Sequence, residues 1–202
     1  MQGVLVPTDS RWVEAALAAL PTVLVDHAHC ERKAALTALR HAARWPEWPR
    51  LAARLSRLAR EELVHYERVI AELAARGLPY GGLPAAQYGA LLFAAVRPAS
   101  EPAPGAPPGT LGQRSVDEML VCALIEARSH ERFVCLRDRV DDKLAALYDD
   151  LLAAEERHGI LYLELAEEAA QADVRARLVE LAAHEAAVLT RPGQPVRMHA
   201  GG

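Results

Sequence analysis

Apolar residues recur three or four positions apart over most of this 202-residue chain, which is the spacing of helices with one buried face. Ala, Leu, Glu and Arg dominate these stretches and are strong helix formers, whereas β-branched residues are scarce. The pattern therefore predicts an all-α protein. Proline, glycine and capping residues divide it into seven helices, which we expect at about Arg11–Leu20, Pro21–Arg44, Pro49–Arg76, Pro84–Val96, Ser115–Arg139, Asp141–Ala170 and Asp173–Leu189.

Local signals set the ends of these helices. Pro21 suits the first turn of a helix, and Gly77 suits the position just after the last turn. Ser115 with Glu118 is typical of a capping box, and Asp173 is expected to cap the last helix. The segment that follows the fourth helix is rich in proline and glycine, so it cannot continue a helix or form a central strand.

Two Glu-x-x-His sequences lie within the predicted long helices, and each is preceded by a further glutamate. The glutamates are 31 positions apart in the first half of the chain and 29 apart in the second. Four carboxylates and two imidazoles in this order are the ligand set of a di-iron or di-manganese site inside a four-helix bundle. The six residues are Glu31, Glu62, His65, Glu126, Glu155 and His158.

The spacing of the glutamates agrees with two antiparallel helix pairs. One midpoint falls in the Pro/Trp turn at residues 46–47, and the other falls at the predicted turn near residues 140–141. Each glutamate is then roughly 22 Å along its helix from the turn. Glu and His at positions i and i+3 share one face of a helix. We therefore expect a ferritin-like antiparallel four-helix bundle with a long crossover connection and additional flanking helices.

Carboxylate and imidazole ligands without a thiolate suit iron or manganese better than structural zinc. Four glutamates balance two divalent ions, and open positions remain for oxygen or water. Glu62 and Glu155 are the expected bridging pair, while His65 and His158 would each bind one metal. One such tetrad arises easily by chance in Glu-rich helices. Here two tetrads with spaced partners occur among apolar neighbours, where an unpaired glutamate is costly.

Composition sets the remaining bounds. The chain is long enough for one domain, which we expect at residues 1–190, followed by a flexible tail at 191–202. The net charge of -4 decides neither for nor against a nucleic-acid partner. The three cysteines form no CxxC pair, which favours a reducing cytoplasm. No apolar run reaches membrane-spanning length, so we expect no membrane association.

The residues around the six candidate ligands resemble a known family. Four parts of the chain carry the likeness: DHAHCERKAA at 26–35, EELVHYE at 61–67 with RGLPY at 76–80, EARSHERF at 126–133, and EERH at 155–158. They are similar to motifs of the bacterial tRNA 2-methylthio-N6-isopentenyladenosine hydroxylases, and the similarity extends from about Pro21 to Ala187. By this match, the same six glutamates and histidines are the metal ligands.

The resemblance implies an activity, cofactors and partners. It implies a non-haem di-iron monooxygenase that hydroxylates the isopentenyl group of the modified adenosine beside the tRNA anticodon. Such an enzyme uses two iron ions, O2 as co-substrate and an external electron donor. The implied partners are tRNA and an electron-transfer reductase, and we expect a cytoplasmic monomer or small oligomer. The 97–110 loop looks individual to this chain, and the resemblance assigns it no role.

Further residues are candidates for contacts around the metals or to RNA. Arg157, inside the second tetrad, and His130, four positions after Glu126, could hydrogen bond to the ligands. Several arginines could bind RNA phosphates. Salt bridges with the many acidic residues explain each arginine equally well. The candidates for tRNA contact are Arg57, Arg60, Arg128 and Arg132.

Other classes of protein remain open alternatives. A ferritin-like ferroxidase, iron-storage or peroxide-detoxifying protein would use the same six ligands. A rubrerythrin-type peroxidase is disfavoured because the chain has no CxxC pairs for a rubredoxin-like iron. A helical interaction protein with an accidental Glu/His pattern would bind no metal.

Overall fold

The computed structural model describes residues 6–45, 48–84, 86–101 and 110–200. The regular elements in this part of the chain are all helices, which confirms the all-α prediction. They are α1 (Ser10–Ala18), α2 (Leu20–Arg44), α3 (Pro49–Ala75), α4 (Tyr88–Phe93), α5 (Gln113–Arg137), α6 (Asp142–Ala170) and α7 (Arg175–Leu189).

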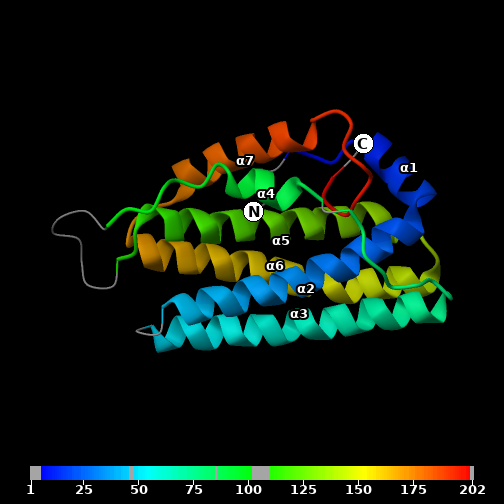
Figure 1. Ribbon diagram of the computed structural model, residues 1–202, viewed down its shortest axis with the longest axis horizontal. Helices are drawn as coiled ribbons and strands as arrows, with labels where there is room; N and C mark the ends of the chain where they lie inside the picture. Colours follow the sequence, from blue (N-terminus) through cyan, green and yellow to red (C-terminus); the bar gives the residue numbers. More distant parts are fainter. Residues whose placement is uncertain (1–5, 46–47, 85, 102–109, 201–202) are drawn as a thin grey trace. The chain divides into compact units, whose positions relative to one another are not determined.

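The chain forms two compact units, each built on one long helix pair. The α2–α3 unit comprises Glu14–Ala85 with Val196–Met198, and the α5–α6 unit comprises Met1–Val13, Ala86–Pro195 and His199–Gly202. Within each unit the two long helices pack side by side and antiparallel, as the ribbon shows (Figure 1). Both predicted helix pairs are therefore present. A single domain over residues 1–190 stays a prediction.

Most helix ends lie where the local signals place them. Pro21 is in the first turn of α2, and Gly77 has a φ of +65° just after the end of α3, which only glycine adopts without strain. At the start of α6, the carboxylate of Asp141 accepts a hydrogen bond from the backbone N–H of Leu144 at 3.2 Å. These residues therefore act as the sequence predicts.

The predicted capping box at Ser115 is wrong. Helix α5 begins at Gln113, with Gly112 as its N-cap residue, so Ser115 lies inside the first turn. Glu118 instead accepts a hydrogen bond from Arg114 Nε at 3.0 Å, and this ion pair on the helix replaces the reciprocal cap.

Two other helices start later than predicted. Helix α4 covers six residues, Tyr88–Phe93, and so is shorter than the expected Pro84–Val96. Helix α7 has Val174 as its N-cap residue, while Asp173 Oδ1 accepts from the backbone N–H of Arg175 at 2.8 Å. Most of the proline-rich loop lies outside the described residues, at 102–109.

Part of the predicted flexible tail, residues 197–200, is buried in the structure. Met198 and Ala200 are 1% and 2% exposed, in spite of the low apolar content around them. The backbone N–H of Met198 donates to the carboxylate of Asp26 at 2.9 Å. The indole N–H of Trp12 donates to the carbonyl of Ala200 at 3.2 Å. Buried contacts with distant residues thus hold this segment.

Candidate metal centre

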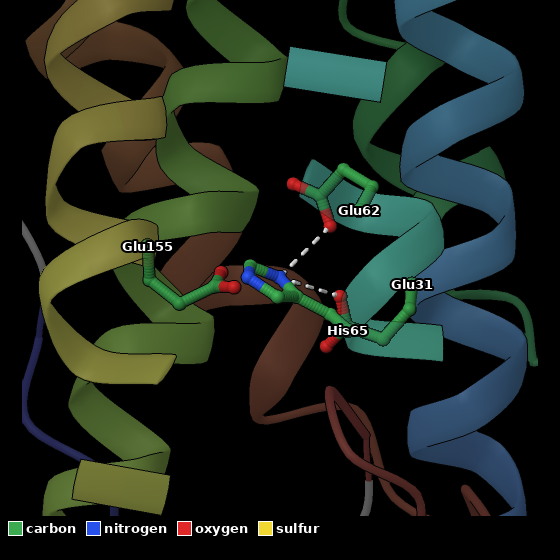
Figure 2. A group of neighbouring side chains, drawn as sticks. All are labelled: Glu31, Glu62, His65 and Glu155. Atoms are coloured by element: carbon green, nitrogen blue, oxygen red, sulfur yellow. Dashed lines mark ion pairs between the residues drawn. The ribbon is translucent and has the colours of Figure 1, made fainter. Parts of the chain in front are cut away.

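In the α2–α3 unit, Glu31 from α2 meets Glu62 and His65 from α3. Figure 2 shows the three side chains pointing toward one another. The Nδ1 atom of His65 lies 3.5 Å from a carboxylate oxygen of Glu31 and 3.6 Å from one of Glu62. All three residues are buried, with exposed fractions between 1% and 7%. The antiparallel pairing of the two helices therefore brings Glu31 and Glu62 together, as the spacing of these two residues predicts.

This cluster stabilises positive charge. Burial alone would lower the pKa of His65, but its hydrogen bonds with Glu31 and Glu62 outweigh that effect and raise the pKa to about 9. Burial alone would raise the pKa of Glu31, yet its hydrogen bonds with His27 and His65 outweigh it and hold the pKa below its usual range. The protonated form of His65 is therefore favoured beside these carboxylates. A divalent cation is the other species that suits such a place.

A second histidine, His27, supports Glu31 from its own helix. His27 Nε2 lies 2.6 Å from Glu31 Oε1, and its ring is 1% exposed. His27 lies outside the two Glu-x-x-His sequences, four positions before Glu31 on α2. The spacing of four residues between His27 and Glu31 on one helix is the signal that could have identified the contact.

In the α5–α6 unit, Glu126 from α5 meets Glu155 and His158 from α6. Each residue offers a ligand atom within 4.8 Å of the other two, and all three are buried. Glu126 is 5% exposed, Glu155 is 2% exposed and His158 is 3% exposed. This unit therefore repeats, on its own helix pair, the arrangement found on α2 and α3.

The chemistry of both clusters fits a metal site. Each offers two carboxylates and one imidazole, with no thiolate, in a place from which water is largely excluded. Buried carboxylates without a cation carry a large desolvation cost. Oxygen and imidazole ligands of this kind suit iron or manganese.

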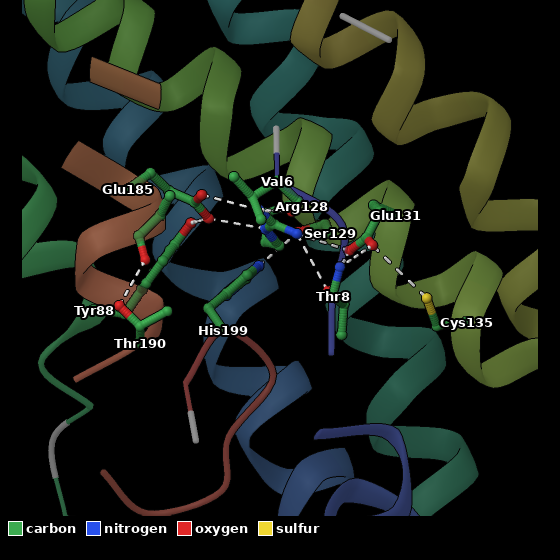
Figure 3. A network of polar contacts seen from close by, with 11 residues as sticks. Val6, Thr8, Tyr88, Arg128, Ser129, Glu131, Cys135, Glu185, Thr190 and His199 are labelled. Atoms are coloured by element: carbon green, nitrogen blue, oxygen red, sulfur yellow. Dashed lines mark hydrogen bonds and ion pairs between the residues drawn. The ribbon is translucent and has the colours of Figure 1, made fainter. Parts of the chain in front are cut away.

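Two arginines predicted to contact tRNA are buried instead. Arg128 is 0% exposed, and its guanidinium makes a two-pronged ion pair with Glu185 of α7, with both N···O distances within 2.9 Å. It also donates to Glu131 at 2.9 Å (Figure 3). Arg132 is 2% exposed, and its guanidinium lies 4.0 Å from the ring centroid of Trp12. Internal partners therefore occupy Arg128 and Arg132, and this burial argues against the predicted contact of either residue with tRNA.

The remaining predicted contacts are differently placed. Arg57 and Arg60 are exposed on α3, where Arg60 donates to Ser56 Oγ at 3.4 Å. Arg157 is exposed, and its guanidinium donates to the carbonyl of Ala153 on its own helix at 2.9 Å. His130 is half-buried on α5. Hydrogen bonds from Arg157 and His130 to the ligands stay predictions.

Within the described residues, no helix is both long enough and apolar enough to span a membrane.

The fold and the two clusters define a class of protein, that of the ferritin-like helical proteins with carboxylate and histidine metal ligands. Within this class, the family profile of tRNA-(MS2IO6A)-hydroxylase (MiaE) matches residues 2–200. The chain therefore belongs to this family of tRNA hydroxylases, as its sequence motifs predict.

Two curated relatives carry the same name, tRNA 2-(methylsulfanyl)-N(6)-isopentenyladenosine(37) hydroxylase. The protein of Pseudomonas putida (strain KT2440) is 43% identical over 197 residues, which cover 96% of this chain and 90% of that protein. The protein of Salmonella typhimurium (strain LT2) is 35% identical over 155 residues, which cover 76% of this chain and 53% of that protein.

A solved structure is also similar to this chain. It is described as protein 43 with aldehyde deformylating oxygenase activity from Synechococcus. The two are 44% identical and superpose with a TM-score of 0.81, over 97% of this chain and 94% of the other. The likeness supports the ferritin-like fold class along nearly the whole sequence.

Proposed function

We propose that this protein hydroxylates the isopentenyl group of 2-methylthio-N6-isopentenyladenosine next to the anticodon of tRNA. The match of the tRNA hydroxylase family to residues 2–200 carries this proposal. The buried clusters on the two helix pairs supply what such a reaction needs, a place for redox-active metal.

The proposed ligands of two iron ions are carboxylates and imidazoles. Each helix pair contributes one Glu and one Glu-x-x-His sequence. When bound, a di-iron centre would supply the activation of O2. One oxygen atom would be inserted into a C–H bond, and the other would leave as water after taking up two electrons from an external donor and two protons from solvent. The ligands are Glu31, Glu62, His65, Glu126, Glu155 and His158.

The protein's own residues would prepare the site in three ways. His27 holds the carboxylate of Glu31 in one orientation through their short hydrogen bond. The carboxylates of Glu31 and Glu62, which raise the pKa of His65, would also stabilise the charge of a bound iron ion. Burial of the ligand side chains limits access of bulk water to the centre.

The partners are part of the proposal. We expect tRNA as the substrate, a reductase as the source of electrons, and a monomer or small oligomer that works in the cytoplasm. Of the four arginines predicted to contact tRNA, the exposed Arg57 and Arg60 remain suited to RNA phosphates.

Reconstitution of the reaction tests the proposal. Purified protein loaded with ferrous iron is mixed with tRNA that carries the unhydroxylated nucleoside, a reductase system and ¹⁸O2. We expect nucleoside mass spectrometry to find a product that is heavier than the unhydroxylated nucleoside by one ¹⁸O atom. Loss of the reaction in Glu62→Ala, with retention in the exposed control Glu67→Ala, would assign it to the metal site. An unchanged nucleoside in all reactions would contradict the proposal.

A second candidate is aldehyde deformylation, which the activity named for the Synechococcus structure favours. The same loaded protein can be supplied with a long-chain aldehyde in place of tRNA. Turnover of the aldehyde without turnover of tRNA would replace the proposed function. Rapid oxidation of excess ferrous iron, without either product, would instead favour a ferroxidase.

A further inference from the structure

Three aromatic rings gather on the surface of the α2–α3 unit. The ring centroid of Tyr80 lies 4.9 Å from that of His29 and 5.9 Å from that of Tyr66, with the two tyrosines edge to face. The hydroxyl of Tyr80 is 3.1 Å from His29 Nδ1. We call these three residues, together with Arg32, the aromatic platform.

Positive charge borders these rings. Nη2 of Arg32 lies 3.5 Å from His29 Nδ1, and both Arg32 and the adjacent Lys33 are exposed. Tyr80 is 39% exposed, and Leu63, one helical turn before Tyr66, is 41% exposed. The surface therefore combines the exposed ring of Tyr80, the half-buried rings of His29 and Tyr66, an exposed apolar side chain and cations.

The platform lies at the level of the ligands in this unit. His29 is two positions before Glu31 on α2, and Tyr66 directly follows His65 on α3. Two residues span about 3 Å along a helix, and a helix with its side chains is about 10 Å across. A group resting on these rings is thus roughly one helix diameter from the carboxylates of Glu31 and Glu62.

We propose that the aromatic platform stacks an unpaired nucleobase of the anticodon loop, with Arg32 on the neighbouring phosphate. Single-stranded RNA is recognised mainly by stacking of splayed bases on aromatic rings and by cations along the backbone. This inference rests on the proposed function and names an RNA contact surface for it. It also replaces the buried Arg128 and Arg132 with residues that RNA can reach.

The same contacts hold the loop after α3 in place. His29 Nε2 lies 2.8 Å from the carbonyl oxygen of Gly81, so the histidine anchors that loop whether or not RNA is bound. A loop anchor and a stacking surface make different demands on Tyr80. As a loop anchor, Tyr80 needs the contact between its hydroxyl and His29. As a stacking surface, Tyr80 needs only the face of its ring.

Binding of an anticodon stem-loop RNA, which carries the unhydroxylated nucleoside, separates these roles. Alanine at Tyr66 or at Tyr80 should weaken binding by about 5- to 150-fold, the range measured for loss of one stacked base. Tyr80→Phe should bind as the wild type does. Val179→Ala, exposed on α7, is the control for loss of an exposed side chain.

Charge and base identity provide two further readouts. Arg32→Ala should lower the slope of log affinity against log salt by about 1, while Arg175→Ala, exposed on α7, should leave it unchanged.

RNAs with an abasic site at each neighbour of the modified adenosine complete a double-mutant cycle. Removing the stacked base should abolish most of the effect of Tyr80→Ala.

The outcomes distinguish failure of this inference from failure of the proposed function. If the wild type hydroxylates the RNA and both alanine variants bind it normally, the platform is not an RNA contact. Equal losses with every RNA, together with a lowered melting temperature and a defective Tyr80→Phe, would show a loop anchor only. Normal RNA binding with slower reduction by the reductase would assign the surface to that protein. If the wild type neither binds nor hydroxylates the RNA, the proposed function fails and this inference fails with it.

Discussion

The carboxylate of Glu31 shows how single side chains set up the candidate centre. It lies between two histidines, with His27 on its own helix at 2.6 Å and His65 on α3 at 3.5 Å. His65 belongs to a Glu-x-x-His tetrad, whereas His27 does not. We therefore treat His65 as a proposed ligand and His27 as a residue that positions the ligand Glu31.

His27→Ala should weaken iron binding by about 10- to 100-fold, because residues that hydrogen bond to metal ligands have effects of this size. Competition titration of ferrous iron measures the affinity. Glu67→Ala, which changes an exposed side chain on α3, is the control. Equal affinities for the wild type and His27→Ala would show that the contact with Glu31 does not support the metal.

The exposure of individual arginines could not be predicted from the sequence. Arg57 and Arg128 both lie on amphipathic helices, yet the first is exposed and the second is 0% exposed. The difference comes from Glu185, which meets Arg128 across 57 positions of sequence. No local sequence pattern predicts a partner that lies so far away in the sequence. By contrast, the i and i+4 spacing of His27 and Glu31 is visible in the sequence.

Between elements, Asp117 joins three parts of the α5–α6 unit. Its buried carboxylate on α5 accepts hydrogen bonds from Arg97, which follows α4, and from Arg177 of α7. Burial alone would raise the pKa of Asp117, but the hydrogen bonds from Arg97 and Arg177 outweigh it and lower the pKa. The ionised form is therefore the one that ties these elements together.

Asp117→Asn should lower the free energy of unfolding by about 3 kcal/mol at pH 7, the cost of breaking a buried ion pair. Because the folded-state pKa is lowered, the stabilisation is present above the unfolded pKa and is lost as pH falls through the folded one. Urea unfolding across a pH series measures both proteins. Their stabilities should converge in acid. A constant difference down to the lowest pH would contradict the assignment.

Helix starts give a second prediction at this scale. Asp141→Ala removes an observed cap and should cost about 1 kcal/mol of unfolding free energy. Ser115→Ala should change it by less than about 0.5 kcal/mol, because Ser115 is inside α5 and makes no cap. Thermal or urea unfolding measures both. A larger cost for Ser115→Ala than for Asp141→Ala would restore the capping box.

At the scale of the whole molecule, hydrophobic spacing and turn residues were sufficient to predict both long helix pairs and the residues that meet within each. Glu31 meets His65, and Glu126 meets Glu155 and His158, because equal distances from a turn bring residues to the same height. The C-terminal segment was not predictable in this way. Met198 is buried by contacts far away in sequence, and nothing near it carries a periodic apolar pattern.

Met198→Ala should therefore lower the free energy of unfolding by about 2–4 kcal/mol, as for other large-to-small changes at buried sites. Arg191→Ala, which changes an exposed residue just after α7, is the control and should stay within about 0.5 kcal/mol of the wild type. Denaturant unfolding measures both variants. Equal stability of Met198→Ala and the wild type would show that the tail is loose after all.

The central claim is that this protein hydroxylates a modified adenosine in tRNA through its Glu/His clusters. Nucleoside analysis of tRNA from cells with and without the gene tests it most directly. We expect the hydroxylated nucleoside to vanish without the gene, with the unhydroxylated isopentenyladenosine derivative accumulating in its place. Wild type and Glu67→Ala should restore the product, whereas Glu62→Ala should not. An unchanged ratio of the two nucleosides in cells lacking the gene would contradict the claim.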